Sequence, residues 1–226
     1  MLDKTTLLVT ACGRPDLLLR TLESLNKCYR LADFAAVWVN EDGIGADNSA
    51  ISAAFPCVRW VNSRPGRGHM AALTSLYANV TTPWIFHCED DWEFYEGGFM
   101  EKSRLRLQNE PRCLQVWLRA HNDTNGHLIE RHPFGLRMSV NGHPTPHRLR
   151  VRRNIWRGFS LNPGLRRASE FANFDFTAAS EGLTGWRAEQ QIGEYFYRRG
   201  YFAAILDNPA GYVRHIGEHR HIEDQA

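Results

Sequence analysis

The chain has 226 residues, of which 43% are hydrophobic, and this is enough for one substantial core rather than two independent domains. Its formal net charge of +2 at pH 7 is too small to favour electrostatic wrapping of nucleic acid, so we expect no nucleic-acid partner. The sequence contains no run of about 18 apolar residues, so we expect no transmembrane helix, while peripheral membrane contact stays open.

Five cysteines are present, an odd number without a CxxC pair. Four of them adjoin apolar runs, namely Cys12, Cys57, Cys88 and Cys113, so we expect buried, reduced thiols. The first residues of the chain hold too short an apolar run for a signal peptide. Together these features predict a protein of a reducing compartment, the cytoplasm.

Short apolar segments alternate with amphipathic ones through the first half of the chain. Apolar runs predict strands at residues 5–11, 35–40, 57–62, 84–89 and 113–119. Helical spacing of apolar residues predicts helices after the first and third strands, and a charged helix over about residues 97–109. This order predicts an α/β fold with a mostly parallel central sheet flanked by helices.

The alternation stops after residue 119. Residues 120–160 contain Gly, Asn and Pro turns and alternate in polarity, which predicts hairpins or a mobile loop. Arginines crowd residues 147–158, which would form either a solvated strand face or a clamp for a diphosphate or an anionic acceptor. A helix is predicted over about residues 186–199, with Gly200 as its C-cap, and a last strand over 202–206.

Polar clusters follow four of the predicted strands, at residues 10–14, 41–42, 62–68 and 89–91. In open parallel sheets ligands bind at the carboxyl ends of the strands. We therefore expect these clusters to meet at one edge of the sheet and to form the functional site there.

Glu89, Asp90 and Asp91 are adjacent and directly follow an apolar run. Three neighbouring carboxylates repel one another and are costly to bury unless water or a cation compensates them. Such a cluster suits Mg²⁺ or Mn²⁺, which complete their coordination with substrate phosphates and water. A solvated acidic turn is the alternative. The position of the cluster after a buried strand favours the cation site.

The order of these motifs resembles that of inverting nucleotide-sugar glycosyltransferases with the GT-A fold, close to the large family-two group. The motifs are VTACGRP, VWVNEDG, GRGHMAAL, CEDDWEF at the DXD signature, AEQQIGEYFYRRGYFAAIL and VRHIG. They extend over about residues 5–217. The order and spacing of the motifs, rather than any single motif, make the resemblance specific. The resemblance implies one GT-A, Rossmann-like domain over 1–226. Residues 1–119 would bind the nucleotide sugar, and 120–226, with a smaller irregular region, would bind the acceptor and carry the catalytic base.

The resemblance also implies roles for individual residues. The nucleotide sugar would be bound by Thr10, Cys12, Arg14, Glu41, Asp42, Arg67, Gly68, Glu89 and Asp90. Asp91 would bind Mn²⁺ or Mg²⁺ at the diphosphate, with a second contact from His215. The Glu-Asp-Asp sequence leaves open which acid contacts the metal.

Glu189 matches the acidic position of the catalytic base, and Glu181 is the reserve candidate. The family has a second acid where this chain has Gln190, which weakens the match. Trp186 lies three residues before Glu189, on a neighbouring part of the same helical face, where it would be either a floor for an acceptor sugar or a core anchor.

These implications together predict a metal-dependent glycosyltransferase that moves a sugar from a nucleoside-diphosphate sugar to a glycan or other hydroxyl acceptor, with inversion. The metal would offset charge on the leaving diphosphate, and the base would take the proton of the acceptor hydroxyl. A sugar-nucleotide nucleotidyltransferase and a non-catalytic nucleotide- or carbohydrate-binding module are the alternatives. Release of pyrophosphate from a nucleoside triphosphate would identify the first.

Overall fold

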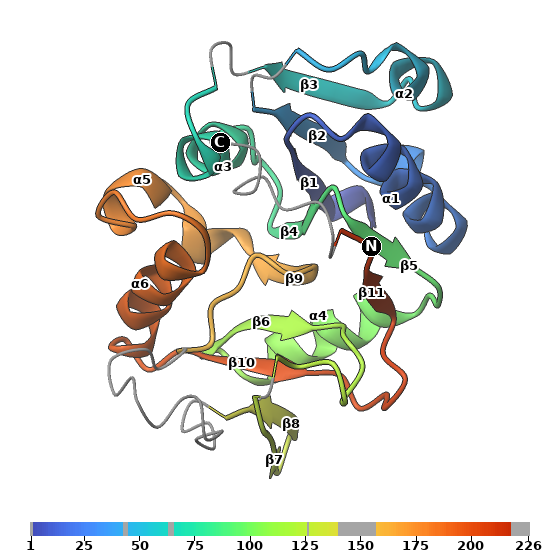
Figure 1. Cartoon of the computed structure of the whole chain (residues 1–226). Helices are drawn as coiled ribbons and strands as arrows, with labels where there is room; N and C mark the ends of the chain where they lie inside the picture. Colours follow the sequence, from blue (N-terminus) through green and yellow to red (C-terminus); the bar gives the residue numbers. More distant parts are fainter. Residues whose placement is uncertain (1, 43–44, 63–65, 126, 140–156, 218–226) are drawn as a thin grey trace.

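In the computed structural model, which describes residues 2–42, 45–62, 66–125, 127–139 and 157–217, a nine-stranded sheet forms the centre (Figure 1). Its strand order is β3-β2-β1-β4-β9-β6-β10-β8-β7. The strands are β1 (Thr5–Ala11), β2 (Ala36–Glu41), β3 (Val58–Asn62), β4 (Trp84–Glu89), β6 (Cys113–Trp117), β7 (Ile129–His132), β8 (Gly135–Met138), β9 (Gly164–Arg167) and β10 (Phe202–Ile205). Strands from both halves of the chain therefore build one sheet.

Most strands of this sheet point in one direction. The pairs β1–β2, β1–β4, β2–β3 and β6–β10 are parallel, whereas β9 runs antiparallel between β4 and β6. At the far edge β8 is antiparallel to both β10 and β7. The mostly parallel sheet predicted from the sequence is confirmed, and β8 and β9 are the reversed strands among those described.

Helices cover both faces of the sheet (Figure 1). One face packs against α1 (Pro15–Cys28), α2 (Ser49–Ala54) and α4 (Phe99–Asn109), and the other against α3 (His69–Tyr77), α5 (Phe176–Ala179) and α6 (Gly185–Tyr197). In α1, Leu18, Leu22 and Leu25 recur at helical spacing and are fully buried. Each contributes about 1.5–3 kcal/mol of burial free energy. Pro15 suits the first turn of α1, where its missing N–H is not needed.

Several short elements were not predicted from the sequence. These are α2, α5, β9 and the small two-stranded sheet of β5 (Trp92–Phe94) and β11 (Val213–His215), together with the 3₁₀ turns Leu2–Lys4, Leu31–Asp33 and Ala168–Phe171. The hairpin expected within 120–160 is confirmed by β7 and β8. Residues 140–156, which hold most of the arginine-rich segment, lie outside the described residues.

All five cysteines lie in the described part of the chain and are free thiols. Cys88 and Cys113 are buried, and the other three are half-buried. Within the described ranges, no helix has the length and apolar character needed to cross a membrane.

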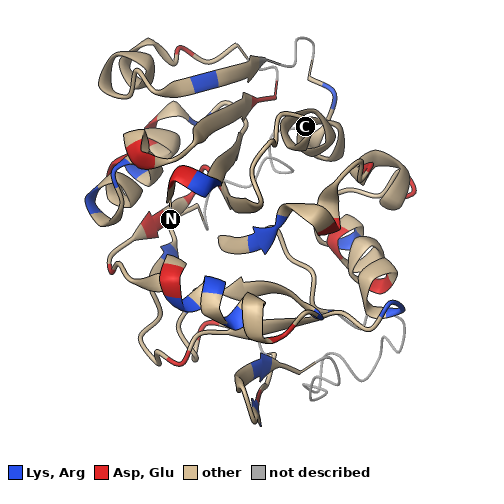
Figure 2. Ribbon diagram, turned by 180° about the vertical axis from the view of Figure 1, so that it is seen from behind, with Lys and Arg blue, Asp and Glu red and all other residues tan. Residues whose placement is uncertain are grey.

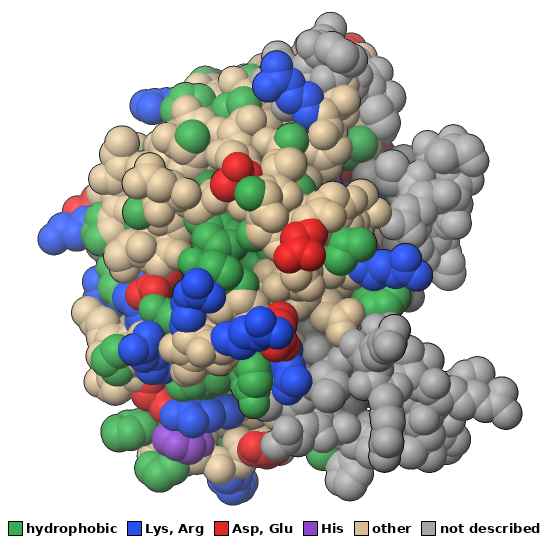
Figure 3. Space-filling model, turned by 90° about the vertical axis from the view of Figure 1, so that its left-hand side faces the viewer, with side chains coloured by type: hydrophobic (Ala, Val, Ile, Leu, Met, Phe, Trp, Pro, Cys, Tyr) green, Lys and Arg blue, Asp and Glu red, His purple; other side chains and the backbone are tan. Residues whose placement is uncertain are grey.

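A cavity of about 750 Å³ opens between α3 and the segment that leads into α5, on the face shown in Figure 3. It is lined by Thr74, Tyr77, Ala78, Val80, Thr81, Thr82, Pro83, Ile85, Ala168, Ser169, Phe171, Ala172, Asn173, Phe174 and Asp175. Because residues 82–83 immediately precede β4, the cavity lies at the amino end of that strand. The polar clusters lie at the carboxyl end of β4, which is where ligands of such sheets bind.

Candidate functional site

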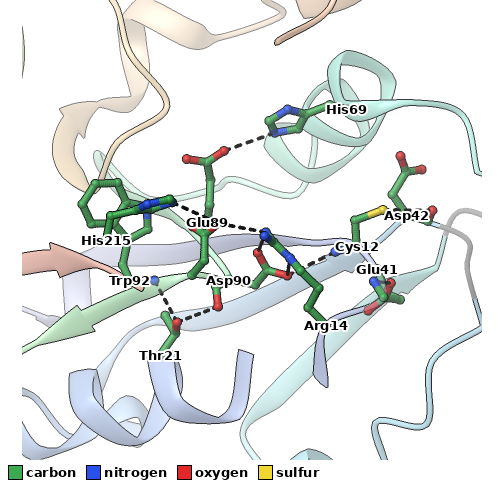
Figure 4. A network of polar contacts seen from close by, with 12 residues as sticks. Cys12, Arg14, Thr21, Glu41, Asp42, His69, Glu89, Asp90, Trp92 and His215 are labelled. Carbon is green, nitrogen blue, oxygen red and sulfur yellow. Dashed lines mark hydrogen bonds and ion pairs between the residues drawn. The ribbon is translucent and has the colours of Figure 1, made fainter. Parts of the chain in front are cut away.

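The polar clusters meet at the carboxyl edge of the sheet, as expected (Figure 4). The backbone N–H of Gly13, just after β1, donates to Oε1 of Glu41 at 2.8 Å. The N–H of Cys12 donates to Oδ2 of Asp90 at 3.3 Å. Glu41 is only 4% exposed, so its carboxylate closes the turn after β1 and is turned away from solvent.

Arg14 contacts two of the three acids that follow β4. Its Nε donates to Oδ2 of Asp90 at 3.2 Å, and an Nη atom pairs with the other Asp90 oxygen. The same Nη lies 3.0 Å from Oδ2 of Asp91. The structure thus places the Arg14 guanidinium against the acids. Burial raises the pKa of Asp90 to about 6, with Arg14 opposing the rise and Asp91 adding to it.

Asp91 also contacts His215, which comes from the other end of the chain. The His215 Nε2 lies 3.2 Å from Asp91 Oδ2, and the imidazole packs beside the Trp92 ring at a centroid distance of 5.1 Å. The pairing of β11 with β5 sets this contact, because His215 is in register with Trp92. Burial raises the pKa of Asp91, but His215 and Arg14 outweigh it and hold that pKa below its usual value.

Glu89 faces the amino terminus of α3. Its carboxylate lies 4.0 Å from the His69 imidazole (Figure 4). The pKa of Glu89 is raised well above its usual value by burial, by the negative charge of Asp91 and by that of Glu189. Burial also lowers the pKa of His69, despite nearby acids that favour its charged form.

The donors fit a hard divalent cation that shares its coordination with a substrate. No group of three or more His, Cys, Asp or Glu side chains within the described ranges forms a ready-made metal site. Such a cation would therefore need phosphate oxygens and water as further ligands. Asp91 is the best-placed carboxylate, because its Oδ1 is buried without a hydrogen-bond partner among the described residues. Both oxygens of Asp90 are already engaged by Arg14 and the Cys12 N–H.

The Asp42 side chain lies where β2 ends and accepts a hydrogen bond from the N–H of Arg67 at 3.0 Å. A Cβ on Gly66 would lie 2.9 Å from the Asp42 carbonyl oxygen, so this close approach requires glycine. Gly68 is the N-cap of α3, with φ of +85°, and a Cβ there would meet nothing within 4 Å. The first N–H groups of α3 have no side-chain cap among the described residues. Thr10 is 6% exposed and lies in β1, which packs against α3.

Glu189 lies in the second turn of α6. Its Oε1 accepts a hydrogen bond from the N–H of Leu161 at 3.1 Å. Burial raises the pKa of Glu189 to about 7, while the Leu161 N–H, Arg166, Ser160 and Arg119 oppose the rise. The negative charge of Glu189 in turn adds to the rise in the pKa of Glu89.

Trp186 and Glu181 lie close to Glu189 in the sequence, and both side chains are exposed. Trp186 is 56% exposed, so the interpretation as a core anchor is wrong. Glu181 is an exposed turn residue with φ of +52°.

Sequence reasoning missed three residues that shape this region. The Thr21 hydroxyl donates to the Asp90 carbonyl at 2.7 Å and accepts from the Trp92 N–H at 3.1 Å, and so fixes the turn that carries the acids. His69 and Arg166 contact or influence the acids directly. Thr21 had no separate signal, because it falls on the apolar face of α1.

No protein-family model and no curated protein sequence matches the chain. Solved structures do resemble it. A mannosyltransferase, PcManGT from Pyrobaculum calidifontis in complex with GDP-Man and Mn²⁺, superposes with a TM-score of 0.60 at 13% identity, over 98% of this chain and 59% of the other. GalNAc-T7 with UDP, GalNAc and Mn²⁺ superposes with a TM-score of 0.63 at 12% identity, over 93% of this chain and 43% of the other.

The chain has the GT-A fold. This confirms the α/β, Rossmann-like class expected from the order of motifs. The chain spans about half the length of these two enzymes, and at such identities the likeness concerns the fold.

Proposed function

We propose that the chain is a metal-dependent glycosyltransferase that transfers a sugar from a nucleoside-diphosphate sugar to a hydroxyl acceptor, with inversion at the anomeric carbon. One observation carries the proposal. Asp91, at the carboxyl end of β4, contacts His215 and Arg14 and keeps its Oδ1 without a hydrogen-bond partner among the described residues. In a GT-A fold this carboxylate supplies a site for the cation and the diphosphate, and Glu189, which the Leu161 N–H holds in place, supplies a base for the acceptor.

The donor would bind across the ends of β1, β2 and β4. Asp42 and Cys12 would contact the nucleoside, next to the Arg67 segment that Asp42 holds in place. The first turn of α3 would face the diphosphate, since uncapped N–H groups and the helix dipole favour anions. Glu89 and Asp90 would lie beside the ribose, with Asp90 acting through Arg14 and the turn at Cys12.

Sugar transfer breaks the bond between the anomeric carbon and a diphosphate oxygen, so negative charge grows on the leaving group. A divalent cation held by Asp91 and His215 would supply the charge that stabilises the leaving diphosphate. The lowered pKa of Asp91 keeps this carboxylate ionised and able to bind a cation at neutral pH. Arg14, whose Nη lies 3.0 Å from Asp91, adds positive charge at the same position.

Glu189 would take the proton of the acceptor hydroxyl as the oxygen bonds to the anomeric carbon. A base works best when its pKa lies near the working pH, and a pKa of about 7 meets that condition. One base opposite the leaving group gives inversion, by the stereochemical logic of inverting hydrolases. The exposed Trp186, one helical turn before Glu189, suits a glycan acceptor, because an indole offers a flat apolar surface to a sugar ring.

Binding can be tested by thermal shift with GDP, UDP and dTDP, each with and without Mn²⁺. We expect one diphosphate to raise the melting temperature only when Mn²⁺ is present, since a ligand that binds only the folded state stabilises it, and does so more as its concentration exceeds the Kd. Asp91→Asn should abolish the shift. Glu93→Gln is the matched control, because Glu93 is a nearby acid that pairs instead with Arg20 and Arg214. A shift of equal size in the Asp91→Asn variant would contradict the metal site.

Turnover can be tested by release of nucleoside diphosphate from the matching nucleotide sugar. We expect Glu189→Gln to keep the thermal shift and lose turnover. Release of pyrophosphate from a nucleoside triphosphate and a sugar phosphate would instead indicate a nucleotidyltransferase. Ligand binding without turnover under all conditions would indicate a binding module.

A further inference from the structure

Arg166 occupies an unusual position for a cation. It lies in β9 at the centre of the sheet, in register with Ile85 of β4 and Gln115 of β6, and its exposed fraction is 0%. Figure 2 shows basic residues in this central strand, between neighbours that carry none. Transferring a charged side chain into such a position is costly unless other groups compensate it.

The contacts of Arg166 are polar but uncharged. One Nη atom donates to the Tyr77 hydroxyl at 2.7 Å, and the other donates to the Ser160 carbonyl at 2.5 Å. The guanidinium also lies near the faces of Phe159 and Phe171, at 5.3 and 5.6 Å from the ring centroids. Among the described residues, no carboxylate forms an ion pair with it within 4.0 Å.

These contacts connect Arg166 with Glu189 through one short turn. The carbonyl of Ser160 accepts from Arg166, and the next residue, Leu161, donates its N–H to the Glu189 carboxylate at 3.1 Å. The Ser160 side chain also favours the ionised form of Glu189 and opposes the rise of its pKa. The turn that holds the carboxylate is thus itself held by the buried arginine.

The charge of Arg166 also acts on Glu189 directly. Burial raises the pKa of Glu189, and Arg166 is one of the groups that oppose the rise. Among the described residues, the other charged groups that act on Glu189 are Arg119, after β6, which also lowers its pKa, and Glu89, at the end of β4, whose charge opposes ionisation. On α6 itself, Arg187 packs over Trp186 at 5.5 Å.

A purely structural role explains these observations less well. Tyr77 and Ser160 are neutral partners, which a neutral side chain could serve at a lower desolvation cost. The nearby His87 is fully buried, and burial and the charge of Arg166 hold its pKa well below the usual value, so His87 stays neutral and does not compensate the arginine. The acid whose ionised form the Arg166 charge stabilises is Glu189.

We propose that Arg166 is a positioning residue for Glu189: it fixes the turn at residues 160–161 and supplies the opposite charge that the half-buried carboxylate needs. This inference rests on the proposed function only for the role of Glu189 as base. The arrangement itself can be tested without turnover.

The test compares Arg166→Met, which removes the charge, with Arg166→Lys, which keeps it. The titration midpoint of the Glu189 carboxyl is followed by carbon-13 NMR in the protein without substrate, with Glu189→Gln to assign the signal. We expect Arg166→Met to raise the midpoint by about one pH unit, and Arg166→Lys to raise it by much less. Arg157→Met is the matched control, because Arg157 pairs with Glu194 on the same helix, and its midpoint should be that of the wild type.

The pH profile of kcat/KM gives the second measurement. We expect its acidic limb to move to higher pH in Arg166→Met by the same amount as the NMR midpoint, with the KM for the donor unchanged. An unmoved NMR midpoint in folded Arg166→Met would overturn the inference. A moved midpoint in a protein without turnover would leave the inference standing and would overturn the proposed function instead.

Tyr77→Phe covers the case in which Arg166→Met does not fold. This variant keeps the charge and removes one acceptor, so we expect the Leu161 N–H to exchange faster with solvent while the Glu189 midpoint stays within about 0.3 pH units of wild type. Unchanged exchange of the Leu161 N–H would show that Arg166 does not hold the turn and would overturn the inference.

Discussion

The His215 imidazole lies 3.2 Å from the carboxylate of Asp91, although the two residues stand far apart in the chain. The contact exists because β11 pairs with β5, the strand that starts immediately after Asp91. It gives the acid cluster a nitrogen ligand and holds the pKa of Asp91 below its usual value. Five predictions concern this contact and the charged groups around it.

Replacing His215 with Ala should weaken Mn²⁺ binding in the presence of the matching nucleoside diphosphate by about 10–100-fold. The loss has two causes, because one candidate ligand is gone and the Asp91 carboxylate loses a partner that favours its ionised form. Isothermal titration calorimetry measures the affinity. His132→Ala is the control, since His132 lies 3.4 Å from Glu110, away from this site. Equal affinities in the two variants would contradict the role of His215.

Replacing Gly217 with Ala should weaken Mn²⁺ binding without removing a ligand. A Cβ at this position would lie 2.5 Å from Oδ2 of Asp91, so the carboxylate would have to move. Gly97→Ala is the control, because its Cβ would meet the Cys28 carbonyl at an ordinary 3.6 Å. We expect a loss of at least about tenfold in affinity for the Gly217 variant and none for the control. Electron paramagnetic resonance measures the concentration of free Mn²⁺ and so gives the affinity of both variants.

The activity should rise with pH through about 7, where Glu189 ionises. Burial favours the protonated carboxyl, which cannot accept the proton of an acceptor hydroxyl, so kcat/KM should fall as the pH drops from 8 to 5. Glu189→Gln should lose about 10²–10⁴-fold in kcat and keep its donor affinity. Initial rates across this pH range test the prediction. A profile that stays flat below pH 7 would exclude Glu189 as the base.

Replacing Arg14 with Met should cost about 3–5 kcal/mol of unfolding free energy at pH 7.5, because it leaves the buried Asp90 carboxylate without its cation. Urea unfolding measures the loss. Arg20→Met, which removes an exposed pair with Glu93, should cost less than about 1 kcal/mol. Adding Asp90→Asn to the Arg14 variant should recover part of the stability.

The cost of the Arg14 substitution should also shrink at pH 5. The folded-state pKa of Asp90, about 6, lies above its usual value, so the stability linked to its protonated form is present at low pH and is lost as the pH rises through about 6. A neutral Asp90 does not need the guanidinium. An equal cost at both pH values would show that Arg14 stabilises the fold through other contacts.

The sequence by itself determined the strands and helices whose apolar residues follow one period over many positions. The strands at 5–11 and 84–89 were predicted with the bounds that the structure has, because a buried strand in a parallel sheet is a continuous apolar run. The polar clusters after these strands determined the edge of the sheet at which the site lies, since all parallel strands end on the same side.

Only the tertiary structure decided which charged groups meet. Strand β9 contradicts the apolar pattern of a central strand, because Arg166 is compensated by Tyr77 and Ser160 from elsewhere in the chain. The tertiary structure also decided how the two neighbouring acids differ. Arg14 hydrogen-bonds to Asp90, whereas Asp91 keeps one oxygen atom without a hydrogen-bond partner among the described residues. Ionisation depends on burial and on the nearest opposite charge, and residues that are distant in sequence supply both.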